Sequence, residues 1–329
     1  MNHILLLGAG FSRNWGGWLA REAFDYLLGC AEVQSDTELQ KILWQAQETG
    51  GFEYALADIQ AAYSRDPSTN EHRLHALQTA VERMFQDMNE AYFELINFEF
   101  QQDLARTVRA FLIRFDAIFT LNQDLLLDHH YLNANVSLGS GGRLNGPQLP
   151  GMRPLPANEV FIPDTWARHI WIPESTFRVE PRYQPCFKLH GSSNWRAANG
   201  SPLLIIGGNK AATIHSHPIL RWYAQQFEDY LSRPNTRLMI IGYGFMDSHI
   251  TDPILKAVES GLKLFIIDHK GADLAKSLNP TRLSGRIIVR TPLETAFERG
   301  LIGSSSRDLS SIFKDDTVEF NKVMRFFQG

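Results

Sequence analysis

Short runs of consecutive apolar residues recur along the chain and usually end in Gly, Asn or Asp. Six of them predict strands: HILLLGAG (3–10), AIFTLNQD (117–124), PLLIIGG (202–208), RLMIIGYGF (237–245), KLFIIDH (263–269) and RIIVRT (286–291). Because apolar residues fill consecutive rather than alternating positions, we expect both faces of each strand to be buried. Helical patterns such as ILRWYAQQFEDYLSR (219–233) separate most of the runs. This alternation predicts an α/β fold with a Rossmann-like, doubly wound and mostly parallel sheet.

Two long segments interrupt the alternation. Residues 36–110 show helical periodicity throughout, with apolar residues three and four positions apart. We therefore expect one domain over 1–329, with a Rossmann-like core at 1–30 and 111–329 and a helical insertion at about 31–110. Residues 133–186 are rich in Gly and Pro and predict a cover loop or a mobile linker. The segment DTVEFNKVMRFFQG predicts an amphipathic helix that docks on the domain or on a partner.

Composition narrows the class of protein. The 329 residues are 44% hydrophobic and 21% charged, as in an average soluble globular protein. A net charge of -4 gives no reason to expect a broad nucleic-acid-binding surface. With only Cys30 and Cys186, neither a disulfide scaffold nor a four-cysteine zinc module can form, which fits a reducing cytoplasm. No stretch approaches the ~20 apolar residues of a membrane helix, so we expect a cytoplasmic protein without a membrane segment.

The first predicted strand leads directly into Gly8-Ala9-Gly10. Such a turn lets the backbone approach a pyrophosphate, while the following helix offers its N-terminal amides. The dehydrogenase fingerprint also needs a third glycine, where this chain has Arg13, and an acidic residue after a second strand, where AFDYLLGC reads as helix. A dehydrogenase is therefore disfavoured. A glycine turn that packs against its neighbours and binds no phosphate remains an alternative. Arg13 either pairs with a phosphate or is a solvated surface residue.

Polar residues follow other predicted strands. Asn122 and Asp124 follow one predicted strand, and residues of these types commonly cap the next helix without taking part in any chemistry. Asp247, which follows Gly242, could likewise be only a helix cap. His190 stands alone between an apolar run and a Gly-Ser-Ser turn. Two histidine pairs, His129-His130 and His215-x-His217, lack a carboxylate or cysteine at metal-ligand spacing, so we expect solvated positions and no metal.

Taken in order, four motifs resemble the sirtuin-like family, in its divergent bacterial branch without the zinc module. They are GAGFS (8–12), TLNQD (120–124), KLHGSSNW (188–195) and GYGFMDSHI (242–250). In that branch the series runs Gly-Ala-Gly-x-Ser, Thr-x-Asn-x-Asp, Leu-His-Gly and Gly-Tyr-x-x-x-Asp. The resemblance extends by motif order from residue 4 to about 270, whereas the helical insertion and the cover loop match no motif. It implies a single sirtuin-like catalytic domain with NAD as substrate and no zinc.

The resemblance also implies a role for each matched residue. Asn122 would sit against the nicotinamide ribose and help to place a water or hydroxyl beside C1′, and His190 would be the catalytic base. The NAD-binding residues would be Gly8, Ala9, Gly10 and Ser12 at the pyrophosphate and nicotinamide ribose, Asp124 at the carboxamide, Gly242 and Tyr243 along the adenosine half, and Asp268 at the adenine-ribose hydroxyls.

Two departures from the protein-deacylating members bear on the activity. The Gly-x-Pro-Asp-Phe-Arg motif is replaced by Gly16-Gly17-Trp18-Leu19-Ala20-Arg21, and the zinc-binding cysteine pairs are absent. Both disfavour a protein deacylase and point to the branch that consumes NAD, often in bacterial antiphage defence. The expected enzyme is an NAD glycohydrolase (NADase) that releases nicotinamide and ADP-ribose, and a His near its ordinary pKa would accept the proton. A non-catalytic module that senses NAD or ADP-ribose is the alternative.

An unregulated NADase would deplete the NAD of its own cell, so we expect gating by oligomerisation or by a partner. We expect no fused sensor module after the catalytic domain, and we therefore predict a separately encoded partner. By family analogy that partner is a HerA-type ATPase, with an Argonaute-like protein as the alternative. We expect a homo-oligomer that does not bind nucleic acid directly.

Overall fold

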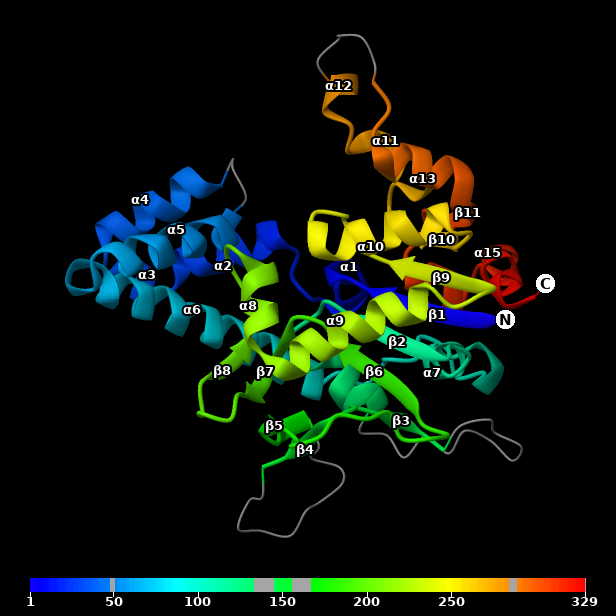
Figure 1. Cartoon of the computed structure of the whole chain (residues 1–329), viewed down its shortest axis with the longest axis horizontal. Coiled ribbons are helices and arrows are strands. Elements are labelled where there is room, and N and C mark those ends of the chain that lie inside the picture. The colour runs from blue at the N-terminus through cyan, green and yellow to red at the C-terminus, as the bar shows by residue number, and fades with distance from the viewer. Residues whose placement is uncertain (48–50, 133–144, 156–166, 284–288, 329) are drawn as a thin grey trace.

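A computed structural model of the chain describes residues 1–47, 51–132, 145–155, 167–283 and 289–328. At its centre lies a seven-stranded sheet in the order β11–β10–β9–β1–β2–β6–β3, and each adjacent pair in that order is parallel (Figure 1). Its strands are β1 (Asn2–Leu7), β2 (Ala117–Thr120), β3 (Pro147–Gln148), β6 (Gln184–Lys188), β9 (Thr236–Ile241), β10 (Lys263–Ile267) and β11 (Leu301–Ser305). The predicted α/β class with a doubly wound parallel sheet is confirmed.

The strand order reverses at β1, which pairs with β2 on one side and with β9 on the other. The register places Leu7 opposite both Thr120 and Ile241, so the carboxyl ends of the three strands lie at one edge. Ile4 and Leu5 are fully buried, in agreement with the uninterrupted apolar run. In open α/β sheets, ligands bind outside the carboxyl ends at such a reversal.

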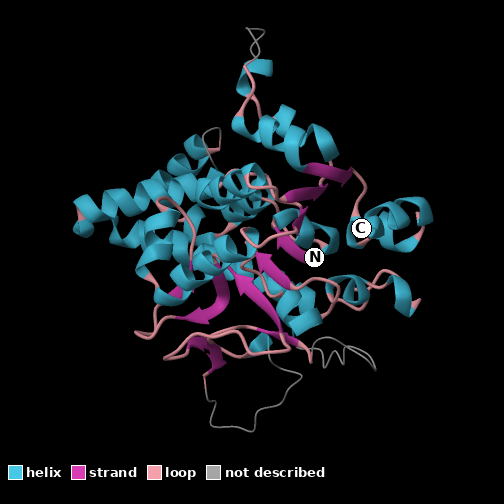
Figure 2. Ribbon diagram, turned by 45° about the vertical axis from the view of Figure 1, so that its right-hand side comes forward, coloured by secondary structure: helices cyan, strands magenta, loops and turns pink. Residues whose placement is uncertain are grey.

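Helices cover both faces of the sheet (Figure 2). Phe227 of α9 (Pro218–Leu231) packs on Phe119 of β2, and Phe326 near the C-terminus packs on Phe265 of β10. The C-terminal segment docks on the domain, where Arg237 donates to the carbonyl of Phe326. The described α-helices that follow Thr107 are α7 (Val108–Leu112), α8 (Lys210–Ser216), α9, α10 (Ser248–Glu259), α11 (Leu274–Ser277), α12 (Pro280–Leu283), α13 (Pro292–Gly300), α14 (Leu309–Lys314) and α15 (Thr317–Met324), and the 3₁₀ turn η6 (Arg325–Phe327) comes after them. Of these, α12 projects away from the sheet (Figure 1).

A layer of helices lies beyond the carboxyl ends of the central strands (Figure 1). It consists of α2 (Ala20–Gly29), α3 (Ala31–Gln34), α4 (Thr37–Ala46), α5 (Gly51–Arg65) and α6 (Pro67–Phe93). Because α2 contacts α5 and α6, the layer includes part of the segment 1–30 that the sequence assigns to the core.

The helix expected up to residue 110 ends earlier. After α6 the chain has only a 3₁₀ turn, η2 (Leu104–Arg106), before α7. Trp15 explains the interruption, because its ring stacks against both Phe98 and Phe100 at centroid distances of 4.9 Å. Phe100 adopts a positive φ of 57°, which does not continue an α-helix. Tertiary stacking therefore overrides the local periodicity.

Two predicted strands also differ from the structure. The run PLLIIGG contributes only β8 (Pro202–Leu204) to a second, four-stranded sheet with β4 (Met152–Pro154), β5 (Trp171–Pro173) and β7 (Gly191–Arg196). Its remainder is a loop that packs against α5, where a Cβ on Gly208 would lie 2.6 Å from the Cβ of Ala57. Residues 286–288 of RIIVRT lie outside the described residues, and 289–291 are not a strand. The sheet edge is β11 instead. Of the cover loop, 133–144 and 156–166 lie outside the described residues.

The turns that follow β1 and β9 touch through their backbones. The amides of Gly8 and Gly10 donate to the carbonyls of Ile241 and Gly242 at 3.0 Å each. A Cβ on Gly10 would lie 2.6 Å from the Cα of Gly242, and Gly242 itself has a φ of 63°. Only glycines allow this approach, because any side chain would separate the two turns.

Gly10→Ala is expected to lower the free energy of unfolding by about 1–3 kcal/mol, since the added methyl meets backbone rather than a movable side chain. Gly29→Ala is the matched control, because nothing lies within 4 Å of its Cβ position at the end of α2; it should raise stability by about 0.5–1 kcal/mol. Urea denaturation of both variants checks this. Equal stabilities for the two would contradict the close contact.

Candidate functional site

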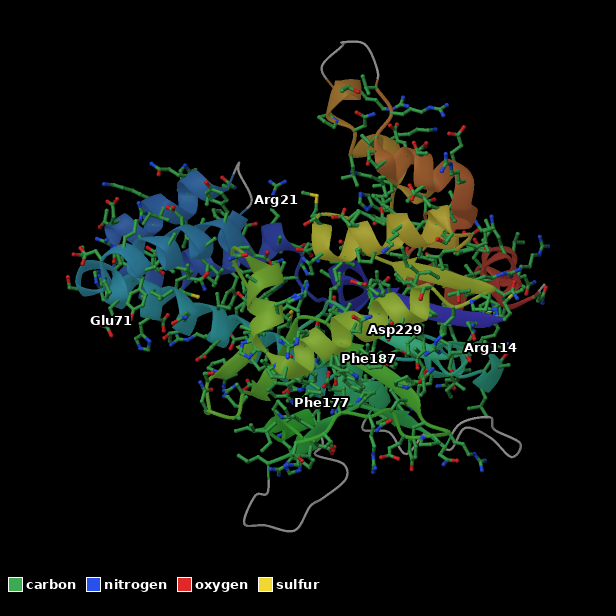
Figure 3. All side chains as sticks on the ribbon, viewed as in Figure 1. Arg21, Glu71, Arg114, Phe177, Phe187 and Asp229 are labelled. Atoms are coloured by element: carbon green, nitrogen blue, oxygen red, sulfur yellow. The ribbon has the colours of Figure 1, made fainter. Side chains whose placement is uncertain are left out.

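A cavity of about 1180 Å³ lies between the helical layer and the carboxyl ends of the strands. This volume slightly exceeds the range of about 300–1,000 Å³ that is usual for small-molecule sites. Its wall includes Arg21 of α2, whose side chain points away from the sheet on the side nearest α10 (Figure 3). The apolar side chains of Tyr54 and Met246 are exposed at this cavity, Met246 by 81%. Seven of the ten predicted site residues line it: Gly8, Ala9, Asn122, Asp124, His190, Gly242 and Tyr243.

The glycine turn presents fewer amides to the cavity than the sequence predicts. The amides of Gly8 and Gly10 donate to the β9 turn, and that of Phe11 donates to the carbonyl of Gly8. The helix that follows, α1 (Ala9–Ser12), has only four residues before the 3₁₀ turn η1 (Arg13–Trp15). Ala9 is the exposed member of the turn, so this wall offers a close backbone approach rather than a nest of free N–H groups.

Ser12 joins the two polar residues that follow β2. Its hydroxyl accepts from Nδ2 of Asn122 at 2.9 Å and donates to Oδ2 of Asp124 at 2.8 Å. Because the amide nitrogen of Asn122 is engaged, its carbonyl oxygen is the atom that it can present to a ligand. Ser12 is buried and is not among the residues that line the cavity, so in this structure it supports Asn122 and Asp124 from behind.

Asp124 also caps the turn that follows it. Its Oδ1 accepts from the amide of Leu126 at 3.1 Å, which is the capping alternative that the sequence left open. Burial raises the pKa of this carboxyl group, although Lys188 and the hydroxyl of Ser12 act in the opposite direction. The π-helix η3 (Asp128–Leu132) continues from this turn.

Asn89 of α6 ties the helical layer to the site, a contact that the sequence analysis missed. Its Oδ1 accepts from the amide of Leu125, and its Nδ2 donates to the hydroxyl of Ser193. A signal was present, because Asn89 lies on the same apolar helix face as Phe85 and Tyr92. A buried amide on such a face needs polar partners elsewhere in the fold.

Lys188, at the end of β6, forms a buried ion pair that the sequence analysis also missed. Its ammonium group lies 2.6 Å from Oδ2 of Asp128 and donates to the main-chain carbonyl of Asp124 at 2.8 Å. The two side chains are only 1% and 4% exposed. The pair therefore holds the turn that carries Asn122 and Asp124 against the end of β6.

His190 follows β6 and is buried, and Gln123 fixes its backbone. Nε2 of Gln123 donates to the carbonyl of His190 at 3.2 Å. The imidazole Nε2 lies 2.8 Å from Nε2 of His249, the second residue of α10. Burial lowers the pKa of His190 well below its ordinary value, which corrects the expected ordinary pKa. His249 lies in a quoted motif, yet neither spacing nor periodicity indicates that it faces His190.

A charged cluster stands beside the two histidines. The ammonium group of Lys210 lies 2.6 Å from Glu53 of α5 and 3.0 Å from Asp247. The Asp247 side chain therefore pairs with Lys210 and makes no hydrogen bond that caps α10. Burial acts to lower the pKa of Lys210, but Glu53 and Asp247 outweigh it and the pKa rises.

The polar groups of three residues that the sequence analysis singled out for ligand contact bond to other parts of the protein. The Tyr243 hydroxyl bonds to the carbonyl of Asp247 and to Thr251 rather than to the open space. Asp268 does not line the cavity; its carboxylate accepts from the amide of Lys270. Arg13 pairs with Glu22 at the surface, 2.6 Å away, so the surface alternative holds for it.

The histidine pairs occupy mixed positions. His130 is buried rather than solvated: its Nε2 lies 2.8 Å from the carbonyl of Tyr92 and its ring stacks on Phe98. His215 is exposed. Within the described part of the chain, no group of three or more His, Cys, Asp or Glu is placed to hold a metal ion. No helix among the described residues is long and apolar enough to cross a membrane.

No family model matches the sequence, and no curated protein matches it. Among solved structures, the chain is similar to one described as "Structural Basis for the Mechanism and Regulation of Sir2 Enzymes". The identity is 12%, the match covers 91% of each chain, and the TM-score is 0.33. At this identity and TM-score, the functional assignment depends on the residues of the cavity.

Lys188→Met is expected to lower the free energy of unfolding by about 3–5 kcal/mol, because it leaves Asp128 as an unpaired buried charge. The double variant Lys188→Met with Asp128→Leu removes both charges and should regain much of that loss. Denaturant unfolding of wild type and both variants measures the difference. A double variant no more stable than Lys188→Met would contradict this account.

The histidines also predict a pH dependence of stability. Burial lowers the pKa of His130 to about 4, whereas an unfolded His titrates near about 6.5. Between these values the unfolded chain binds more protons, so the free energy of unfolding falls as the pH drops below about 6.5. His130→Gln, which can still donate to Tyr92, should flatten the stability profile between about pH 7 and 5. If the stability profiles of wild type and His130→Gln ran parallel over this pH range, the pKa of His130 would not be lowered in the folded protein.

Proposed function

We propose that the protein hydrolyses NAD at the bond between nicotinamide and ribose, releasing nicotinamide and ADP-ribose. The observation that carries the proposal is the convergence of Asn122 and His190 on one cavity with Gly8 and Gly242. These residues follow four different strands, and the cavity lies where doubly wound sheets bind their ligands. The ordered motifs of the sequence supply the identity of the substrate.

The reaction needs little from the protein beyond orientation and one weak base. Water attacks C1′ of the nicotinamide ribose, and the C1′–N bond breaks with its electron pair passing to the pyridine nitrogen. Nicotinamide leaves as a neutral molecule, so no strong general acid is required. The transition state has cationic character at C1′, which a carbonyl oxygen such as that of Asn122 can stabilise or use to hold the water.

His190 is suited to accept the proton that the water loses. Because burial lowers its pKa, the imidazole is neutral at physiological pH and retains an acceptor nitrogen. A base with a low pKa is weak, but the reaction has a good leaving group and the proton moves late, after the C1′–N bond has weakened. The neutral histidine also avoids placing a cation beside the developing charge.

The biological setting is a second part of the proposal. The motif series favours bacterial antiphage defence, in which depletion of NAD stops the infected cell. Because such an activity is harmful without infection, we propose that oligomerisation or a separately encoded partner controls it. A HerA-type ATPase is the first candidate, and an Argonaute-like protein is the second.

The decisive experiment follows nicotinamide release from NAD by the purified protein, alone and with the candidate ATPase. Asn122→Ala and His190→Ala are each expected to lower the rate by roughly 100-fold or more, since they remove the polar group at C1′ and the base. Chromatography of the second product separates ADP-ribose from its cyclic form.

Asn321→Ala and His215→Ala are the matched controls, because both residues are exposed and lie outside the cavity. Melting curves establish that all four variants are folded. Wild-type rates in Asn122→Ala and His190→Ala would refute the site assignment. Binding of NAD without nicotinamide release under any condition would instead favour a sensing module.

A further inference from the structure

The two histidines on the cavity wall form a contact that the proposed reaction does not itself require. Nε2 of His190 and Nε2 of His249 are 2.8 Å apart, which is a hydrogen-bond distance. One ring must donate and the other must accept, because a neutral imidazole has one N–H and one lone pair. A single proton therefore lies between the two Nε2 atoms.

The contact joins two distant turns of the sheet. His190 follows β6 and His249 lies near the start of α10, after β9, and β1 and β2 separate these strands in the sheet. His190 is buried, whereas His249 is partly exposed to the cavity. A histidine at the cavity wall thus reaches the buried one from the opposite half of the sheet.

Burial, rather than the surrounding charges, keeps both rings neutral. Burial lowers the pKa of each histidine, Lys210 lowers both further, and Asp247 opposes this shift. Lys210 is itself held by Glu53 from α5 and by Asp247 from the turn before α10. These groups are the charges that face the pair, and a second proton between the two Nε2 atoms would break the hydrogen bond.

We infer that His249 is a positioning residue for His190: it holds the ring through Nε2 and thereby selects the orientation in which His190 meets the substrate. This inference rests on the proposed function, because it assigns His249 to the same reaction. Because Nε2 of His190 is engaged with His249, Nδ1 is the ring nitrogen of His190 that remains. The direction of the hydrogen bond fixes which of the two nitrogens of His190 carries the proton. His249 thus acts on the reaction through His190 and not on C1′.

The first test compares His249→Leu with His249→Gln in nicotinamide release. His249→Leu removes the hydrogen bond, so we expect kcat to fall about 10-fold or more while KM changes less than about 3-fold. The acid limb of the kcat–pH profile should also move to higher pH. His249→Gln supplies an amide at the same place and should recover a part of kcat. His215→Leu, at an exposed histidine outside the cavity, should match wild type.

The second test does not depend on activity. Imidazole ¹H–¹⁵N spectra recorded over a pH series report the tautomer and titration of His190 directly, and His190→Asn identifies its signals. We expect His249→Leu to change the His190 tautomer ratio and to move its titration to higher pH, because a neighbouring ring that disfavours protonation is gone. If His249→Leu does not fold, His249→Ala, which also removes the ring, serves for the same comparison.

The outcomes separate the two proposals. If wild type releases nicotinamide and His190→Ala does not, but His249→Leu keeps the wild-type kcat and pH profile, the role of His249 is overturned and the proposed function stands. If wild type releases no nicotinamide, the proposed function fails, and the spectra then decide whether the pair exists. An unchanged His190 spectrum in His249→Leu would overturn the pair itself.

Discussion

The site depends on the close backbone contact between the turns after β1 and β9. Gly8 and Gly10 donate their amides to that second turn, and a Cβ on Gly8 would lie 2.5 Å from the carbonyl oxygen of Gly242. This contact closes the sheet at the point where its strand order reverses, and it aligns the ends of β1, β2 and β9. In this contact the amides of Gly8 and Gly10 donate to backbone carbonyls and are not free to bind a ligand. The turn therefore contributes to the site mainly by shaping the cavity.

The polar residues around this contact are stabilised by partners from distant parts of the chain. Ser12 links Asn122 to Asp124, and the ammonium group of Lys188 holds the Asp124 backbone while it pairs with Asp128. Burying these groups without partners would be unfavourable, so each one restricts where the others can lie. The result is a support behind the cavity wall, and the proposed reaction requires such a support because its weak base acts only on a precisely oriented substrate.

The helical layer is a second determinant of the site. Glu53 of α5 neutralises Lys210 across the cavity from the strands, and Asn89 of α6 bonds to the backbone of Leu125 and to Ser193. Removing this layer would expose the apolar strand ends and leave Lys210 with Asp247 alone. The layer therefore belongs to the chemistry of the cavity, where burial lowers the pKa of His190 and keeps the ring neutral.

The sequence by itself determined the fold class, the strands β1, β2, β9 and β10, and the positions of Gly8, Asn122 and His190 at strand ends. These features are local: strand burial shows in consecutive apolar residues, and a turn shows in its glycines. Only the tertiary structure decided which polar groups meet, as with His190 and His249, Lys188 and Asp128, and Lys210 and Glu53. It also decided that Trp15 interrupts the helix near Phe98 and Phe100, and that β11 forms the sheet edge. The physical reason is that hydrogen bonds, ion pairs and ring stacking act between residues far apart in the chain, and periodicity records only what neighbouring residues share.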